Sequence, residues 1–378
     1  MRRDNDGVGS ATVAICFAGW LNVNIPFNGA SARRHLVSSL AADAFVAGTF
    51  NVNATGGAPD CHDTGGKCLL GQLRELRPRI VRLRLDPMLT DEQIAERLSV
   101  SPVWRRVAAR DAAMPLRRGP GAHVSLWAPL LGSKQLSVLR EQHDLYRVLA
   151  LLSAHEDRRG RTYSRVIWSR LENDWLAPHP PLRMLTTGVV WAPPDATMSD
   201  RHAVMDRDAA EIYLGRWRLL GTRSDELLNM SSIASLHSLT PERFVLSLLH
   251  WRGHKLRLFP PTQALSCCAA RSRCYASTVC NHVRNVPTSD GARNVSGKYT
   301  HELRLAVGHA AALLRGGASW TPTNLAERSE SGRLRNRYHG SLVGLTLTLP
   351  ADAPVDVEAE LLGRYQVSTR WVRGFRRS

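Results

Sequence analysis

The sequence predicts an α/β protein: a mostly parallel sheet flanked by helices, followed by a loosely structured C-terminal extension. Short apolar runs that end at glycine or proline alternate with segments of helical periodicity. Hydrophobic residues make up 43% of the 378 residues, which suffices for at least one sizeable core. After about Cys280 the pattern changes to polar sequence rich in glycine and serine. These three observations carry the fold prediction.

The chain opens as strand, helix and strand. Residues 11–19 form a nearly continuous apolar run that ends at a glycine and is too short for a helix, which is typical of a buried parallel strand. Residues 31–42 have helical spacing with a serine at the expected N-cap, and residues 43–52 predict a second strand. Residues 79–86 alternate charged and aliphatic side chains like a half-exposed strand. Residues 90–98 predict a capped amphipathic helix.

The alternation continues after a polar, arginine-rich stretch, residues 105–125, that predicts an insertion loop. The elements expected beyond it are a long helix (133–157), a strand (163–171), a short strand (188–194), an amphipathic helix (200–220), a helix leading into a strand (240–260) and one late strand (340–350). We therefore expect a Rossmann-like domain over residues 1–268 and a partly disordered extension over residues 269–378.

The chain carries a formal net charge of +17, and only four of its 50 basic residues are lysines. A cluster of cations would favour a nucleic acid or an anionic membrane as partner, because binding releases counterions. The arginines are instead spread from Arg2 to Arg377, which indicates a solvated, arginine-rich surface. We do not expect a nucleic acid as partner, although residues 158–165 (RRGRTYSR) fit that alternative. A phosphate-bearing small substrate remains compatible, since a few guanidinium groups can grip one.

Seven cysteines are an odd number, so at least one stands outside any disulfide within the chain. Their spacings do not match the tight pairs of structural zinc sites. No apolar run approaches the roughly 20 residues that a membrane-spanning helix requires. The localisation stays open: a secretory compartment such as the Golgi lumen is expected if an N-terminal anchor precedes Met1, and the cytoplasm otherwise.

Two acidic side chains, Glu172 and Asp174, directly follow a predicted strand. Ligands of open α/β sheets bind beyond the carboxyl ends of the strands. The spacing of two lets both carboxylates point to one side of an extended backbone, where they could hold a hard divalent cation. The alternative is structural: Glu172 would pair with Arg170 or Arg165, and Asp174 would cap the turn before Trp175.

Four pieces of the sequence occur in a recognisable order: ICFAGW with ADAFVAGTF, then YSRVIWSRLENDWLAPHPP, then VVWAPPDATMSDRHAVMDRDAAEIYLGRW, then RFVLSLLHWRGHKLRLFP with a cysteine pair behind it. Together they resemble a eukaryotic domain-of-unknown-function family that is itself similar to GT-A-type nucleotide-sugar glycosyltransferases, and they cover residues 11–268. The resemblance implies a GT-A-like fold and the transfer of a sugar from a nucleotide-diphosphate donor to a hydroxyl group of a glycan or other acceptor.

On the donor side, the resemblance implies that Arg170 steadies the diphosphate of the nucleotide sugar. The loop that carries Gly19, Trp20 and Asn22 would approach the nucleotide, with the glycine allowing close backbone contact. Trp175 would contact the sugar; the alternative for this tryptophan, and for the other tryptophans nearby, is a place in the core.

For the chemistry, the resemblance places Glu172 and Asp174 where related enzymes have a metal- or donor-binding acidic motif. Asp200, with Arg201 and His202, would border the acceptor pocket, and Asp200 and Glu172 are the expected catalytic carboxylates, Asp200 as the base of an inverting transfer. The alternatives are that Asp200 is the N-cap of a helix and that His202 is a surface or core histidine.

The segment LEND departs from the Asp-x-Asp motif of the metal-dependent members of such families. A divalent cation, Mn²⁺ or Mg²⁺, is implied by the resemblance, and this departure argues against a strict requirement for it. The same departure favours the alternative function, a catalytically inactive relative that binds a sugar or nucleotide or serves as a scaffold.

Overall fold

The computed structural model describes the following parts of the chain: residues 12–20, 29–50, 73, 75–76, 79–99, 101, 105, 136–194, 199–221, 241–266, 281–288, 291–297, 299–314, 318–322, 342–343 and 345–348. Asn22 and almost all of the predicted insertion loop lie outside these residues, as do all the cysteines except Cys16. Cys16 is buried in the core.

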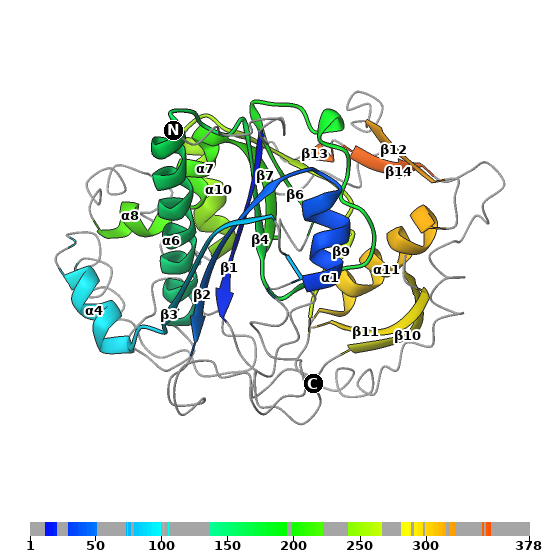
Figure 1. Cartoon of the computed structure of the whole chain (residues 1–378), viewed down its shortest axis with the longest axis horizontal. Coiled ribbons are helices and arrows are strands. Elements are labelled where there is room, and N and C mark those ends of the chain that lie inside the picture. Colours follow the sequence, from blue (N-terminus) through cyan, green and yellow to red (C-terminus); the bar gives the residue numbers. More distant parts are fainter. Residues whose placement is uncertain are drawn as a thin grey trace, which may run out of the picture.

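A mixed sheet of eight strands forms the centre of the fold, in the order β13-β8-β6-β7-β4-β1-β2-β3 (Figure 1). Its strands are β1 (Val13–Trp20), β2 (Asp43–Phe50), β3 (Ile80–Pro87), β4 (Arg165–Arg170), β6 (Val189–Ala192), β7 (His202–Asp206), β8 (Lys255–Leu258) and β13 (Leu342–Val343). All neighbours are parallel except β7, which runs antiparallel to β4 and β6. The predicted α/β, Rossmann-like class is confirmed.

Strand β1 is buried on both faces of the sheet. Ala14 and Cys16 point into one core cluster, and Ile15 and Phe17 point into another on the opposite face. Successive side chains of a strand alternate between faces, so a strand covered on both sides must be apolar at every position. This explains why the opening apolar run of the sequence predicted the strand correctly.

Helices cover both faces of the sheet (Figure 1). One face carries α6 (Leu136–Arg159), α7 (Arg207–Tyr213) and α10 (Pro241–Trp251). The short α1 (Gly29–Ala32) and the π-helix η1 (Arg33–Ser38) cover the other face. Helix α4 (Asp91–Ser99) and α8 (Arg216–Gly221) form a smaller cluster with α6. The capping box predicted for α4 is present, because Thr90 and Gln93 exchange backbone-to-side-chain hydrogen bonds of 2.9 and 3.2 Å.

Two sequence predictions about helices are wrong. Residues 200–220 begin as strand β7 and become helical only from Arg207. In β7, Ala203 and Met205 face one core cluster and Val204 the other, so pairing with β4 outweighs the helical pattern. The first helix begins at Gly29, which places Ser31 inside it and not at its N-cap.

Regular structure continues beyond residue 268. It consists of the hairpin β10 (Asn281–Thr288) and β11 (Gly291–Gly297), the helix α11 (Thr300–Leu314) and the pair β12 (Ser319–Pro322) and β14 (Leu345–Thr348). The apolar side chains of β10, β11 and α11 pack on Leu176 and Ala177, next to the small pair of β5 (Asn173–Trp175) and β9 (Gln263–Leu265). Polar composition did not indicate these elements, and the boundary at residue 268 stays a prediction.

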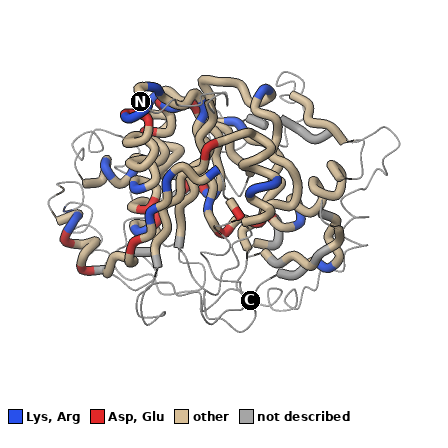
Figure 2. Tube along the Cα trace, in the orientation of Figure 1, with Lys and Arg blue, Asp and Glu red and all other residues tan. Residues whose placement is uncertain are grey.

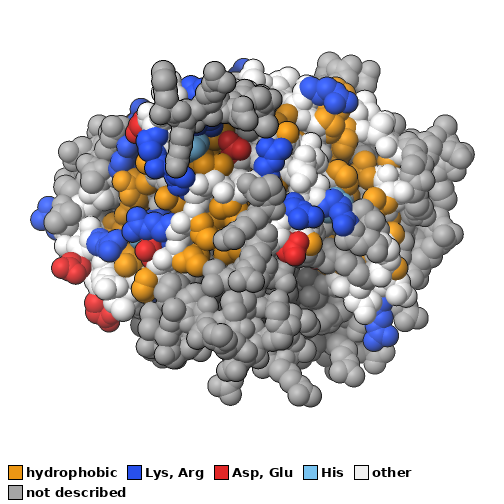
Figure 3. Space-filling view, viewed as in Figure 1, with side chains coloured by type: hydrophobic (Ala, Val, Ile, Leu, Met, Phe, Trp, Pro, Cys, Tyr) orange, Lys and Arg blue, Asp and Glu red, His pale blue; other side chains and the backbone are white. Residues whose placement is uncertain are grey.

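Basic residues are distributed over the fold. Figure 2 shows lysine and arginine positions on helices, strands and connections in all regions of the described chain. On the face shown in Figure 3, basic side chains lie among hydrophobic ones and form no single block. None of the helices in the described part is both long and apolar enough to cross a bilayer.

Candidate functional site

The parallel strands β1, β2, β3 and β4 end along one side of the sheet, here called the carboxyl edge. The register aligns Ala18 with Arg170 across β1 and β4. The N–H group of Leu171 donates to the oxygen of Ala18 at 3.3 Å, and that of Arg170 donates to the oxygen of Arg201 at 2.9 Å. Ligands of such sheets bind beyond this edge. The fold therefore gathers predicted site residues from three separate segments.

Gly19 and Glu172 meet at this edge. Gly19 has a φ of +151°, and a methyl group in its place would lie 2.8 Å from Oε2 of Glu172. The Glu172 side chain is only 6% exposed, and its backbone oxygen accepts the N–H of Ser266 at 2.9 Å. Because residue 19 has no side chain, the carboxylate can rest against the end of β1. Trp20 continues β1.

Asp174 is held by helix α1. Its Oδ1 accepts the Ser31 hydroxyl at 3.2 Å, and the Ser31 oxygen in turn accepts the backbone N–H of Trp175 at 3.2 Å. Between the two acids, the Asn173 amide donates to the Ser169 hydroxyl at 3.2 Å and to the oxygen of Arg201 at 3.1 Å. These contacts join the acidic segment to strand β4, to the start of β7 and to α1.

The described part of the chain contains no group of three His, Cys, Asp or Glu side chains that could hold a metal ion. Glu172 and Asp174 supply two carboxylates, and Ser31 already engages one of them. Mg²⁺ is commonly held by one or two carboxylates together with waters and substrate phosphates. The divalent cation stays a prediction, and the chemistry below is derived without it.

Arg170, the predicted diphosphate ligand, is paired with Glu141 of α6. Its Nε donates to Oε1 at 3.2 Å, and its second terminal nitrogen contacts Oε2. Burial raises the pKa of Glu141 to about 7; the Arg170 charge opposes this rise and the Asp200 charge adds to it. A donor diphosphate would therefore compete with Glu141 for Arg170.

Asp200 lies beside this pair, at the turn that enters β7. Its backbone oxygen accepts the Trp168 indole N–H at 2.8 Å and the Tyr213 hydroxyl at 3.3 Å. A strand and not a helix follows, so the N-cap alternative for Asp200 is wrong. The buried Asp200 carboxylate acts electrostatically on both Glu141 and Tyr213, which places it among the charges of the carboxyl edge.

Arg201 is buried between the sheet and helix α11. Its guanidinium donates to Oε2 of Glu302 at 2.9 Å and lies 4.4 Å from the ring centroid of Tyr299. Sequence reasoning missed Glu141, Tyr299 and Glu302. No local signal could have found them, because each reaches the edge from an element distant in sequence.

His202 lies in the core. Its Nδ1 is 2.7 Å from the oxygen of Trp168, and since a carbonyl only accepts, this nitrogen carries the proton. The ring packs against those of Trp175, His179 and Phe259 at centroid distances of 5.0 to 5.7 Å. Burial lowers the pKa of His202 well below its usual value. This geometry matches the core alternative, and the fully buried Trp175 offers no ring surface to a sugar.

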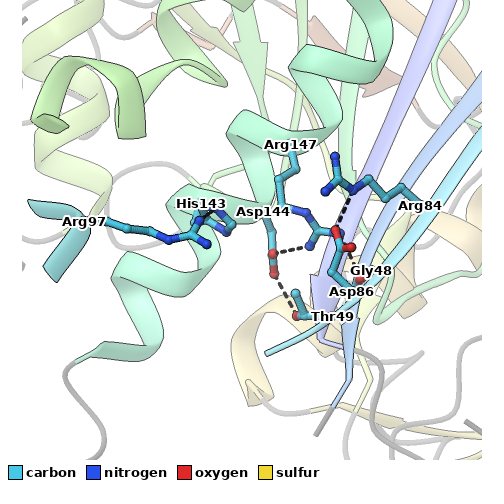
Figure 4. A network of polar contacts seen from close by, with 8 residues as sticks. All are labelled: Gly48, Thr49, Arg84, Asp86, Arg97, His143, Asp144 and Arg147. Atoms are coloured by element: carbon cyan, nitrogen blue, oxygen red, sulfur yellow. Dashed lines mark hydrogen bonds and ion pairs between the residues drawn. The ribbon is translucent and has the colours of Figure 1, made fainter. Parts of the chain in front are cut away.

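A second polar network ties α6 to the ends of β2 and β3 (Figure 4). Asp144 accepts the Thr49 hydroxyl at 3.0 Å and an Arg147 nitrogen at 2.9 Å. Arg147 also donates to Asp86 and, at 3.3 Å, to the oxygen of Gly48. Burial raises the pKa of Asp144 to about 7. The network fixes the first turns of α6, which carry Glu141, at the carboxyl edge.

Comparisons with known proteins give little beyond this geometry. No protein family and no curated protein matches the chain. Among solved structures, the apo form of mouse xyloside xylosyltransferase 1 is similar over 70% of this chain and 90% of that chain, with 11% sequence identity and a TM-score of 0.30. This similarity is too low to bear on the activity of the chain.

Proposed function

We propose that the chain is a glycosyltransferase that moves a sugar from a nucleotide-diphosphate donor to a hydroxyl group of an acceptor. The observation that carries the proposal is the contact of the Glu172 carboxylate with Gly19 at the carboxyl edge, beside Arg170. The mixed α/β sheet and the resemblance of the sequence to GT-A-type enzymes support it.

On the donor side, Gly19 lets the nucleotide approach the end of β1, and Arg170 pairs with the diphosphate. Arg170 must then leave Glu141. Because the pKa of Glu141 is already raised to about 7, this carboxylate can take up a proton when its partner turns away. The Arg170 charge then stabilises the negative charge that develops on the leaving diphosphate.

On the acceptor side, Asp200 is the proposed base. The acceptor hydroxyl passes its proton to the carboxylate while its oxygen forms a bond to the anomeric carbon of the donor. The bond from that carbon to the diphosphate oxygen breaks, and its electron pair leaves with the diphosphate. Glu172, held against Gly19, faces the reacting centre from the donor side.

The test is the turnover of a panel of uridine and guanosine diphosphate sugars, with and without Mn²⁺, for the native chain and for the Glu172→Gln and Asp200→Asn variants. We expect each variant to lose about 100-fold in activity, as general acid–base groups do. Glu211→Gln, a substitution on the outer side of α7, is the matched control. Native turnover that either site variant retains in full would reject the role assigned to that residue.

A second candidate function is binding without turnover. It is favoured by the two ion pairs, Arg170 with Glu141 and Arg201 with Glu302, which occupy both arginines of the edge. Calorimetry with nucleoside diphosphates, combined with the turnover panel, distinguishes the two functions, because a binding protein would show affinity for the nucleotide and no release of sugar from any nucleotide sugar.

A further inference from the structure

The C-terminal elements reach the carboxyl edge at the start of helix α11. Gly297, at the end of β11, forms a bridge with Ser266. The N–H group of Ser266 donates to the backbone oxygen of Glu172 at 2.9 Å. Tyr299 lies two residues after Gly297. Its backbone oxygen accepts the N–H of Leu303, in the first turn of α11. Tyr299 is thus connected to the acidic segment of the candidate site by its short distance in sequence from Gly297, by the Gly297–Ser266 bridge and by the Ser266–Glu172 hydrogen bond.

The Tyr299 ring lies against Arg201 and is partly exposed. The guanidinium of Arg201 lies 4.4 Å from the ring centroid. Arg201 cannot readily move, because its side chain donates to Glu302 and its backbone oxygen accepts the N–H of Arg170. Even so, Tyr299 is 39% exposed, which is high for a large apolar ring in the described part of the chain.

The phenol group sits among the charges of the candidate site. Burial of the hydroxyl raises the pKa of Tyr299, the charges of Arg201 and Arg170 oppose the rise, and those of Asp200 and Glu302 add to it. The hydroxyl therefore stays protonated at neutral pH and can donate a hydrogen bond. An aromatic face with hydrogen-bonding groups around its rim is what a pyranose requires, because a sugar ring has an apolar C–H face bordered by hydroxyl groups.

We propose that Tyr299 is the sugar-contacting residue of the site, stacking the exposed part of its ring on a pyranose ring, and that Glu302 is the positioning residue that holds Arg201 against Tyr299. This inference rests on the proposed function and assigns a substrate-binding role to the C-terminal elements. The pyranose can belong to the donor or to the acceptor, and the kinetic arms of the test separate these two sources.

The test compares Tyr299→Ala with Tyr299→Phe, which keeps the stacking surface. Trp251→Ala is the matched control, since Trp251 is also an exposed aromatic ring over an arginine, 4.3 Å from Arg252, at the end of α10. We expect Tyr299→Ala to raise the KM of one sugar substrate at least about 10-fold, in the range of a lost aromatic contact. The Phe variant and the control should stay within about threefold of the native KM.

The substrate whose KM rises identifies the source of the sugar. The affinity for the free nucleoside diphosphate should stay within about twofold in Tyr299→Ala, because this ligand carries no pyranose. An equal loss of affinity for the free nucleotide would show that the ring stacks on the base and would overturn the proposal. Unchanged KM values for both substrates would overturn it as well. Glu302→Gln should raise the same KM as Tyr299→Ala, which a purely structural role would not do.

A separate arm distinguishes this inference from the proposed function. Saturation-transfer NMR with free methyl pyranosides measures sugar binding without any turnover. Binding by the native chain that Tyr299→Ala abolishes supports the inference even if no nucleotide sugar is consumed, in which case only the transferase proposal fails. Turnover that is present and insensitive to Tyr299→Ala leaves the transferase proposal standing and rejects the inference. Native protein that neither binds pyranosides nor turns over donors rejects both.

Discussion

The two edges of the central sheet both carry buried charges, and the charges are held in different ways. At the amino edge, where β1 and β4 begin, Glu156 accepts the backbone N–H of Tyr163 at 2.8 Å and Nε of Arg207 at 2.8 Å. Asp206 accepts an Arg165 nitrogen at 3.1 Å, and the N–H of Gly188 as well. Each of these carboxylates therefore joins an arginine to the backbone of a neighbouring element.

At the carboxyl edge, the arginines pair with carboxylates on helices of other layers. Arg170 pairs with Glu141 of α6, and Arg201 pairs with Glu302 of α11. Burial raises the pKa of Glu141 and that of Asp144 to about 7, so both titrate near neutrality. Carboxylates that are readily protonated release their arginines more easily. The comparison teaches that the amino edge stabilises the sheet, while the Arg170–Glu141 pair of the carboxyl edge is suited to exchange with a ligand.

The largest expected effect tests the amino edge. Arg207→Ala removes the guanidinium that faces Glu156, whose side chain is only 4% exposed. Breaking a buried ion pair leaves an uncompensated charge, and we expect a loss of about 3–5 kcal/mol in the free energy of unfolding, measured in urea. Arg218→Ala is the control, because Arg218 makes a longer, 3.6 Å contact with the half-exposed Glu211. Equal losses in the two variants would contradict the role of the amino edge.

The next effect concerns pH and the histidine cluster beside the carboxyl edge. Burial lowers the pKa of His179 from 6.5 to about 4. Between pH 4 and pH 6.5, His179 is therefore protonated in the unfolded chain and neutral in the folded chain. The contribution of His179 to the free energy of unfolding is fully present above pH 6.5 and is lost as the pH falls toward 4. The titration of His179 lowers the free energy of unfolding by about 3 kcal/mol over this pH range.

His179→Phe removes the titrating group and keeps an aromatic ring among Trp175, His202 and Phe259. We expect the variant to lose less stability than the native chain between pH 6.5 and 4, as followed by urea unfolding at several pH values. The difference between the two chains should be constant above pH 7. Parallel pH profiles throughout would show that His179 does not contribute to acid unfolding.

The third prediction disturbs the contact between Gly19 and Glu172 at the carboxyl edge without removing a charge. Gly19→Ala introduces a methyl group 2.8 Å from Oε2 of Glu172, at a φ that L-residues rarely adopt. The carboxylate must move, and we expect a loss of about 100-fold in turnover, the usual cost of displacing a reacting group by about 1 Å. The double variant Gly19→Ala with Glu172→Asp should regain about 10-fold, because aspartate is one methylene shorter.

Gly253→Ala is the matched control at the start of β8. Gly253 also has a positive φ, +79°, and a methyl group there meets no atom within 4 Å. This variant should lose about 1 kcal/mol of stability from backbone strain and keep its turnover. A similar loss of turnover in both variants would mean that strain, and not the contact with Glu172, accounts for the effect of Gly19→Ala.

The sequence was sufficient for elements with a complete local pattern. Strand β1 is apolar at every position, and α6 repeats its apolar residues over many turns, so both were predicted within a few residues. Strand β7 was not, since the apolar Ala203 to Met205 also fit a helix and only pairing with β4 decides between the two. The hairpin was missed because its few valines gain meaning only against Leu176 and Ala177, and α11 was missed because its largely apolar sequence lies in a region of polar composition.

The residues of the candidate site also fall into a predicted group and a missed group. The meeting of Gly19 with Glu172 follows from the rule that parallel strands end together, and it could be predicted from two strand ends. Glu141, Tyr299 and Glu302 could not be predicted, because helix packing brings them to the edge. Site residues that sheet topology brings together can be predicted from a single sequence, whereas site residues that packing between layers brings together cannot.

The smallest expected effect lies at the outer end of the carboxyl edge. Asp86 contacts two arginines, the buried Arg147 and the 60% exposed Arg84, whose Nε lies 2.7 Å from the carboxylate. An exposed ion pair gains little because water screens it, so Arg84→Ala should change the free energy of unfolding by less than about 1 kcal/mol in urea. Raising the salt concentration should reduce that difference further. A loss well above this value would show that the exposed rim of the edge also stabilises the fold, and the contrast between the two edges would then be one of degree.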